Sequence, residues 1–295
     1  MIRPAIFFAL FAALMMVSPM QAEDAQDCSL TTISAFRMDL GESGRVRIPV
    51  FLNHHPFKML IDTGAYFSGV SPTVATPLGI KVYKAEDFAL VGWGGQMSNS
   101  FVEVQQFSMG KTGRETTKFM VLYTGDEFDG LIGADFLIFF DLDFDFAKAR
   151  LNFVSPKHCP GKVVYWTQGA YGAVPFSYLQ HDIALKIVLD GKTVDAILDT
   201  GAATTVMSRE RAIDLFGLDK KKAPEGLARD LFKQMSFGSV AVKSPAITLV
   251  SDEKSKLMGS GTKPSMILGM DVLRNLHFYI SYKEEMIYVT PASQY

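Results

Sequence analysis

The sequence is poor in the residues that build metal centres and disulfide scaffolds. It has 2 cysteines and 5 scattered histidines in 295 residues, which excludes a cysteine-rich scaffold and argues against a multi-ligand zinc site. It also lacks a charge imbalance, because 29 Lys and Arg residues face 31 Asp and Glu residues, for a net charge of -2. This balance leaves no electrostatic footprint for nucleic acid or an anionic membrane surface. The sequence has no Gly-x-Ser-x-Gly motif, so the nucleophile signal of a serine hydrolase is missing.

The composition is that of a folded protein. Apolar residues make up 48% of the chain and charged residues 20%, which excludes global disorder and permits a packed core. At roughly 150 residues per domain, the length predicts about two domains.

A long apolar run occurs only at the N-terminus. Arg3 precedes an unbroken apolar stretch at residues 5–17, and Gln21-Ala22 follows a helix-breaking Ser18-Pro19. This pattern is typical of a secretory signal peptide. We therefore expect residues 1–22 to be removed on export, leaving a periplasmic or secreted protein with no membrane span. A signal anchor is the alternative, but the run is short for a membrane span, which needs about 20 residues.

Export places the two cysteines in an oxidising compartment, where an even number of cysteines favours pairing. We therefore predict a disulfide between Cys28 and Cys159. Two unpaired thiols are the alternative.

Two sequence blocks occur twice. Residues 57–71 read FKMLIDTGAYFSGVS and residues 194–208 read VDAILDTGAATTVMS, while residues 130–137 read GLIGADFL and residues 266–273 read MILGMDVL. The two Asp-Thr-Gly-Ala cores are 137 residues apart, and the Gly of the second block follows the Asp of the first by 71 and 70 residues. Because two separate blocks repeat at nearly the same spacing, the chain contains a duplicated domain.

Most of the remaining sequence alternates with period two. This alternation predicts strands at residues 45–50, 141–146, 184–189 and 286–289. We expect a mostly β protein with two lobes, at residues 23–160 and 161–295.

Helix is expected only in one or two short pieces per lobe. Ser71 and Ser208 have the character of N-caps, and Gly79 and Gly217 are expected to end these helices.

Each Asp-Thr-Gly triplet ends an apolar strand, where an ionised carboxylate is costly unless it is paired or hydrogen-bonded. If the two repeats pack by pseudo-two-fold symmetry, Asp62 and Asp199 meet at the axis. Two carboxyls that share one site cannot both ionise easily, so the pair holds one acid and one base side by side. Hydration of a peptide carbonyl requires such a combination.

The duplicated motif resembles that of the aspartic protease superfamily. It is most similar to the retropepsin-like bacterial aspartyl proteases, here with two lobes in one chain as in pepsin. The resemblance covers nearly all of the chain after the signal peptide and implies two acid-protease-like β-barrel lobes related by pseudo-two-fold symmetry.

The resemblance also implies roles for individual residues. Asp62 and Asp199 would be catalytic. Support for the active site would come from the residues that follow them, Thr63 and Gly64 in the first repeat and Thr200 and Gly201 in the second. Behind each active loop would lie the strands that carry Gly133 and Gly269.

The family folds a β-hairpin flap over its substrate. A glycine-rich stretch resembles the tip of such a flap: Gly92, Trp93, Gly94 and Gly95. An ordinary hairpin turn is the alternative. The first repeat departs from the family at Tyr66, where small residues are usual, and this ring is expected to narrow one side of the cleft.

Other acidic residues receive structural interpretations. Asp141, Asp143 and Asp145 imitate the start of a calcium loop, but Phe146 and Asn152 occupy its glycine and glutamate positions. We interpret the three aspartates as the polar face of a strand and expect no metal and no cofactor. We expect Asp135 and Asp271 to cap short helices.

The sequence therefore predicts an exported aspartic endopeptidase, a hydrolase in which two Asp carboxyls activate a water to cleave a peptide or protein substrate. The first alternative is a catalytically silent aspartic-protease-like module that binds peptides or proteins. Retention of both Asp-Thr-Gly motifs argues against it. The second is a structural envelope protein, and the lack of adhesive repeats argues against that.

Overall fold

The structure is a computed structural model, and the part of the chain that it describes is mostly β. It describes residues 28–86, 90–91, 97–122, 128–179, 181–221, 223–228, 230–251 and 265–292. The signal peptide expected at residues 1–22 lies outside the described residues. Within the described ranges, no helix is long and apolar enough to cross a membrane.

A nine-stranded sheet comes from the N-terminal half of the chain. Its strands are β2 (Arg47–Leu52), β3 (His55–Ile61), β4 (Gly69–Val70), β5 (Val82–Lys84), β8 (Ser100–Val104), β9 (Phe107–Met109), β10 (Thr112–Arg114), β11 (Thr117–Val121) and β12 (Gly130–Ile132). They lie in the order β10-β9-β2-β3-β12-β4-β11-β8-β5. Two further strands, β6 (Leu90–Val91) and β7 (Met97–Ser98), form a separate antiparallel pair.

A fourteen-stranded sheet contains the C-terminal half and three strands of the N-terminal half. Its strands are β1 (Thr32–Arg37), β13 (Asp141–Asp145), β14 (Arg150–Val154), β15 (Gly172–Leu179), β16 (Asp182–Leu189), β17 (Lys192–Leu198), β18 (Val206–Ser208), β19 (Gly226–Ala228), β20 (Gln234–Phe237), β21 (Val240–Lys243), β22 (Ile247–Val250), β23 (Met266–Leu268), β24 (Leu276–Ser281) and β25 (Met286–Pro291). The main path runs β1-β14-β13-β24-β25-β15-β16-β17-β23-β18-β22-β19. The four strands expected from period-two alternation correspond to β2, β13, β16 and β25.

The described helices are short, as expected: α1 (Pro72–Ala75), α2 (Ala134–Leu137), α3 (Arg209–Phe216) and α5 (Met270–Leu273). Ser71 caps α1 by accepting a hydrogen bond from the Thr73 amide, and Ser208 caps α3 by accepting one from the Arg211 amide. Gly217 ends α3 in the left-handed conformation, with φ of 63°. The expectation that Gly79 ends α1 is wrong, because this helix already ends at Ala75 and a turn follows.

The strand order of the N-terminal half recurs in the C-terminal half. The path β2-β3-β12-β4-β11 is matched by β16-β17-β23-β18-β22. In both paths, the strand that leads into Asp-Thr-Gly pairs in parallel with the strand of the second repeated block: β3 with β12, and β17 with β23. The repeat in the sequence is therefore also a repeat in the pairing of strands.

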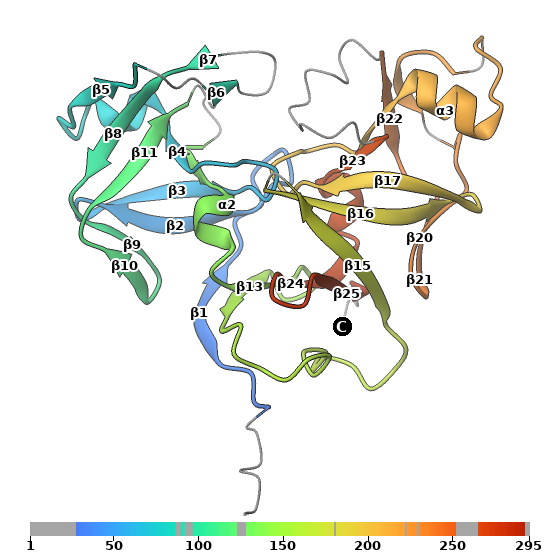
Figure 1. The fold of residues 1–295 in the computed structure, drawn as a ribbon, viewed down its shortest axis with the longest axis horizontal. Coiled ribbons are helices and arrows are strands. Elements are labelled where there is room, and N and C mark those ends of the chain that lie inside the picture. Colours follow the sequence, from blue (N-terminus) through green and yellow to red (C-terminus); the bar gives the residue numbers. More distant parts are fainter. Residues whose placement is uncertain are drawn as a thin grey trace, which may run out of the picture.

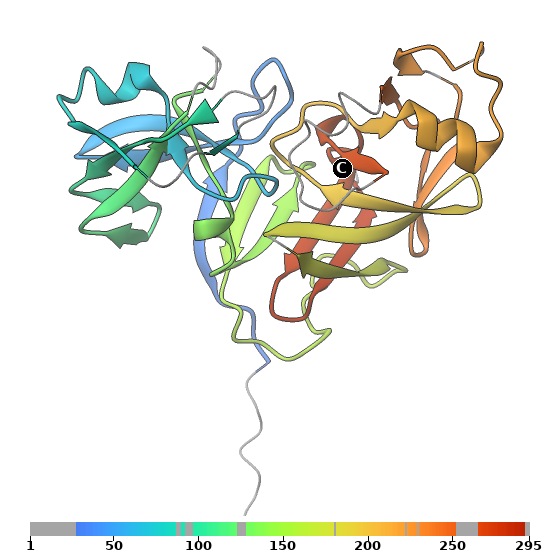
Figure 2. The ribbon, with the colours of Figure 1, turned by 45° about the horizontal axis from the view of Figure 1, so that its top comes forward.

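The two halves share the run β1-β14-β13-β24-β25-β15, which lies between and below them (Figures 1 and 2). At its centre β13 pairs antiparallel with β24, so that Phe144 lies opposite Phe278. The Cys28–Cys159 disulfide is present and links the chain before β1 to the segment after β14.

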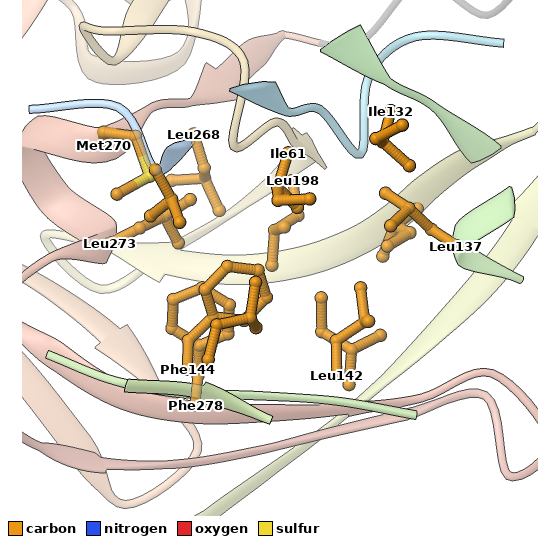
Figure 3. Close-up of a cluster of buried hydrophobic side chains, with 14 of the residues drawn as sticks. Ile61, Ile132, Leu137, Leu142, Phe144, Leu198, Leu268, Met270, Leu273 and Phe278 are labelled. Carbon is orange, nitrogen blue, oxygen red and sulfur yellow. The ribbon is translucent and has the colours of Figure 1, made fainter. Parts of the chain in front are cut away.

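Buried apolar side chains from both halves pack together above this run (Figure 3). The rings of Phe144 and Phe278 stack with their centroids 4.5 Å apart. Ile61 and Leu198, the residues before the two repeated aspartates, belong to the same buried cluster. The core thus supports the loops that carry Asp62 and Asp199.

Asp141, Asp143 and Asp145 form one face of β13, as expected of a strand, but all three are buried. They accept hydrogen bonds from several polar side chains that cover this face: His158, His277, Asn152, Tyr165 and Tyr279. This polar face meets other protein groups because the segment after β14 and strand β24 lie over it. No metal is needed to explain the three aspartates.

Candidate active site

The structure brings the two Asp-Thr-Gly triplets together at the junction of the two halves. Asp62 follows the last residue of β3, and its amide donates to the Ile132 carbonyl over 3.0 Å. Asp199 follows the last residue of β17, and its amide donates to the Leu268 carbonyl, also over 3.0 Å. Each triplet is therefore anchored to the strand of the second repeated block.

The two threonines join the loops by reciprocal hydrogen bonds. The Thr63 hydroxyl donates to the Leu198 carbonyl over 2.9 Å and accepts from the Thr200 amide over 3.0 Å. The Thr200 hydroxyl donates to the Ile61 carbonyl over 2.7 Å and accepts from the Thr63 amide over 3.1 Å. Both threonines are buried, so water does not compete for these bonds. We call this set of four bonds the threonine grip.

The carboxyl groups of Asp62 and Asp199 lie side by side within hydrogen-bonding reach of each other. The two glycines make this approach possible. A Cβ atom at Gly64 would lie 2.5 Å from Asp199 Cγ, and a Cβ atom at Gly201 would overlap the Asp62 carboxyl group. Any side chain at either glycine would therefore push the carboxyl group of the other half away.

Burial raises the pKa of both aspartates, and the environments of the two carboxyls differ. The pKa of Asp62 lies well above its ordinary value because of burial and the neighbouring charge of Asp199. Burial also raises the pKa of Asp199, but the Gly201 and Ala202 amides, Asp62 and the charge of Arg45 oppose that rise. The pair therefore favours one proton, held on Asp62, with Asp199 ionised.

Asp135 and Asp271 act differently from expectation, because neither caps a helix. Glycines 133 and 269 occupy the N-cap positions of α2 and α5, without a side-chain bond. Asp135 instead accepts from the Ser68 amide and hydroxyl, over 2.9 and 2.6 Å. Asp271 accepts from the Thr205 amide and hydroxyl, over 2.8 and 2.7 Å.

Sequence reasoning missed Ser68 and Thr205, which complete this support. Each hydroxyl also accepts from the amide of the glycine in the second repeated block, over 2.8 Å in the first half and 3.0 Å in the second. Ser68 and Thr205 each stand six residues after the repeated aspartate. A comparison of the two repeats for residues of shared chemistry could have found them.

Tyr66 lies at the junction of the two halves. Its ring is 43% exposed and contacts the His181 ring from the C-terminal half, with centroids 3.7 Å apart. The predicted flap tip, residues 92–95, lies outside the described residues. The flanking strands β6 and β7 pair with each other, with Val91 opposite Met97. The role of Trp93 stays a prediction.

Among the described residues, no group of three or more His, Cys, Asp or Glu side chains is arranged to hold a metal ion. The chemistry open to the described site is that of its own groups, namely one protonated and one ionised carboxyl.

Comparison with known families agrees with this geometry in the first repeat. Residues 48–136 match a family model described as aspartyl protease. The matched stretch contains Asp62, Thr63 and Gly64 together with the second block up to Phe136. A search of curated proteins found no match. The match supports an aspartyl protease family, and with it a hydrolase that takes a peptide substrate.

Proposed function

We propose that the protein is an exported aspartic endopeptidase with two lobes, residues 23–160 and 161–295. The lobes would be homologous β-barrels related by a pseudo-two-fold axis that passes between Asp62 and Asp199. The observation that carries the proposal is the contact of these two carboxyls, held by the threonine grip. The signal-peptide pattern and the disulfide support export to the periplasm or beyond it.

The proposed reaction uses a water bound between the two carboxyls. Ionised Asp199 takes a proton from this water as its oxygen attacks the peptide carbonyl carbon. Protonated Asp62 gives its proton to the carbonyl oxygen, so a neutral tetrahedral diol forms. Asp199 then protonates the amide nitrogen and Asp62 recovers a proton from a diol hydroxyl as the carbon–nitrogen bond breaks. Both aspartates end in their starting states.

The test is hydrolysis of a denatured protein by the purified mature chain. Asp62→Asn and Asp199→Asn should each lower the rate by about a hundred-fold or more, because each removes the acid or the base. The double variant should be scarcely slower than either single variant, since the pair works as a unit. Asp195→Asn is the matched control, because Asp195 lies on the same strand β17 but is exposed and pairs with Lys186.

The outcome separates the proposal from a silent binding module. Cleavage that persists in both single variants would show that another group or a contaminant is responsible. Absence of cleavage by the folded, unmutated protein over a broad pH range would favour the binding module.

A further inference from the structure

Two oppositely charged residues occupy equivalent positions beside the aspartate pair. Arg45 and Asp182 are 137 residues apart, the same offset that separates Asp62 from Asp199. Their equivalence rests on the proposed function, in which a pseudo-two-fold axis relates the two repeats. Under that symmetry, a positive charge on one side of the axis corresponds to a negative charge on the other.

Strand register brings each of these residues to its aspartate. Arg47 is paired with Leu60, and the pairing continues through the Ile61 amide, which donates to the Val46 carbonyl. The next step along both strands reaches Arg45 and Asp62. In the other half, Ala184 is paired with Ile197, and two further steps reach Asp182 and Asp199. Neighbours across antiparallel strands have Cβ atoms about 5 Å apart.

Arg45 is held in place by protein groups. Its Nη1 donates to the Gly201 carbonyl over 3.3 Å and its Nε donates to the Ser43 hydroxyl over 2.9 Å. The guanidinium carbon also lies 4.7 Å from the centroid of the Phe128 ring. Arg45 therefore presents a fixed positive charge that reaches across to the loop of Asp199.

Asp182 is the opposite case. It is only 8% exposed, and among the described residues no hydrogen bond or ion pair reaches its carboxylate. Burial and the charge of Asp199 raise the pKa of Asp182 to about 6. A buried carboxylate without a partner is unfavourable, and an incoming cation would relieve that cost.

The surroundings of Asp182 place it at the wall between the halves. The preceding residue, His181, contacts the Tyr66 ring of the N-terminal half, and the Tyr178 hydroxyl lies 3.4 Å from His181 Nδ1. Asp182 thus lies between this aromatic contact and the aspartate pair. A peptide that runs past both aspartates passes Asp182 on one side of its scissile bond and Arg45 on the other.

We propose that Asp182 is a specificity residue that binds the ammonium or guanidinium group of a Lys or Arg side chain of the substrate on one side of the scissile bond. Arg45, at the equivalent position on the other side, disfavours a basic residue there. A hydrogen bond to a charged group that is lost on substitution changes binding by roughly ten-fold to a hundred-fold. Both an attractive and a repulsive element would then set the direction in which the peptide binds.

The test is cleavage of a mixed peptide library, with the cut sites read by mass spectrometry. The unmutated protein should enrich Lys and Arg at one position on one side of the cut by about ten-fold or more. Asp182→Asn should lose this enrichment at that position alone. Asp182→Arg, which copies the residue of the other repeat, should reverse it toward Asp and Glu. The control Asp195→Asn removes an exposed carboxylate from the neighbouring strand and should keep the profile.

Two results would overturn the inference. One is an identical cut-site profile in the unmutated protein and Asp182→Asn. The other is an equal change in kcat/KM for paired Lys and norleucine peptides, accompanied by a shifted pH–rate profile, because Asp182 would then act on the aspartate pair and not on the substrate.

A binding experiment separates this inference from the proposed hydrolysis. The same library is captured on immobilised Asp62→Asn protein, with and without Asp182→Asn, and the retained peptides are sequenced. Enrichment of Lys and Arg that depends on Asp182 supports the inference even if the unmutated protein cleaves nothing, in which case hydrolysis alone fails. Cleavage that depends on both aspartates, without enrichment of basic residues, leaves the function standing and refutes the inference.

Discussion

Replacing Thr63 with valine should destabilise the protein, because valine keeps the shape of threonine and removes its hydroxyl. The Thr63 hydroxyl donates to the Leu198 carbonyl and accepts from the Thr200 amide. Thr63 is 1% exposed, so water cannot replace either bond. A buried polar group that loses its partner costs about 1–3 kcal/mol. With two such groups, the free energy of unfolding should fall by about 2 to 6 kcal/mol, a large part of the roughly 5–15 kcal/mol typical of a folded domain.

Urea unfolding followed by circular dichroism measures this change through the transition midpoint at constant slope. Thr63→Ser retains the hydroxyl and should recover most of the loss. Thr193→Val is the matched control, because Thr193 is an exposed residue of strand β17 and the substitution should change stability by no more than about 0.5 kcal/mol.

The double variant Thr63→Val with Thr200→Val tests whether the grip acts as one unit. Once one hydroxyl is lost, the two loops are free to separate, so the second loss should cost less than it does alone. A Thr63→Val variant as stable as the Thr193→Val control would refute the reasoning. So would strict additivity of the two losses, because it would mean that the loops are held by other contacts.

Two further predictions concern the aspartate pair and the disulfide. Burial raises the folded pKa of Asp62 and Asp199, so the folded pair holds protons that the unfolded chain releases near pH 4. Its contribution to stability is full at low pH and is lost as the pH rises through the folded pKa values. Asp62→Asn should therefore gain stability relative to the unmutated protein as the pH rises, measured by urea unfolding at several pH values, and a relative loss would contradict this. Proteolysis should follow a bell-shaped pH profile, since activity needs one proton on the pair, and a profile that stays flat across both limbs would contradict it. Removing the disulfide with Cys28→Ser and Cys159→Ser should cost up to about 5 kcal/mol, because the bridge closes a loop with a sequence separation of 131 residues. The reduced unmutated protein should match this variant, and an unchanged urea midpoint would contradict the loop-entropy argument.

The sequence carried enough information to predict the strands that support the site and the bridge between Cys28 and Cys159. Period-two alternation depends on local geometry, so the expected strand at residues 45–50 corresponds to β2. The alternation could not tell whether a polar face meets water. Asp143 belongs to such a face and is buried, because His277 and Tyr165 from distant segments donate hydrogen bonds to it.

Hydrogen bonds between distant residues were the least predictable feature of the site. A helix N-cap was a reasonable expectation for Asp135, since it stands in the first turn of α2. The position is decided by Ser68, which lies 67 residues earlier in the chain and reaches Asp135 with both its amide and its hydroxyl. Such a partner is known only once β3 and β12 are paired.

The two repeats agree in the groups that hold the aspartates and differ in the groups proposed to meet the substrate. Carboxyls that share one proton need nearly the same backbone support on both sides, so Ser68 and Thr205 perform the same task in the two halves. A peptide has two different ends, and the two sides of the scissile bond are not equivalent. The exchange of Arg45 for Asp182 fits that requirement, because it changes charge beside the aspartate pair without touching the threonine grip. Asymmetry at this position gives a duplicated chain a way to distinguish the two directions of a bound peptide, which two identical lobes do not have.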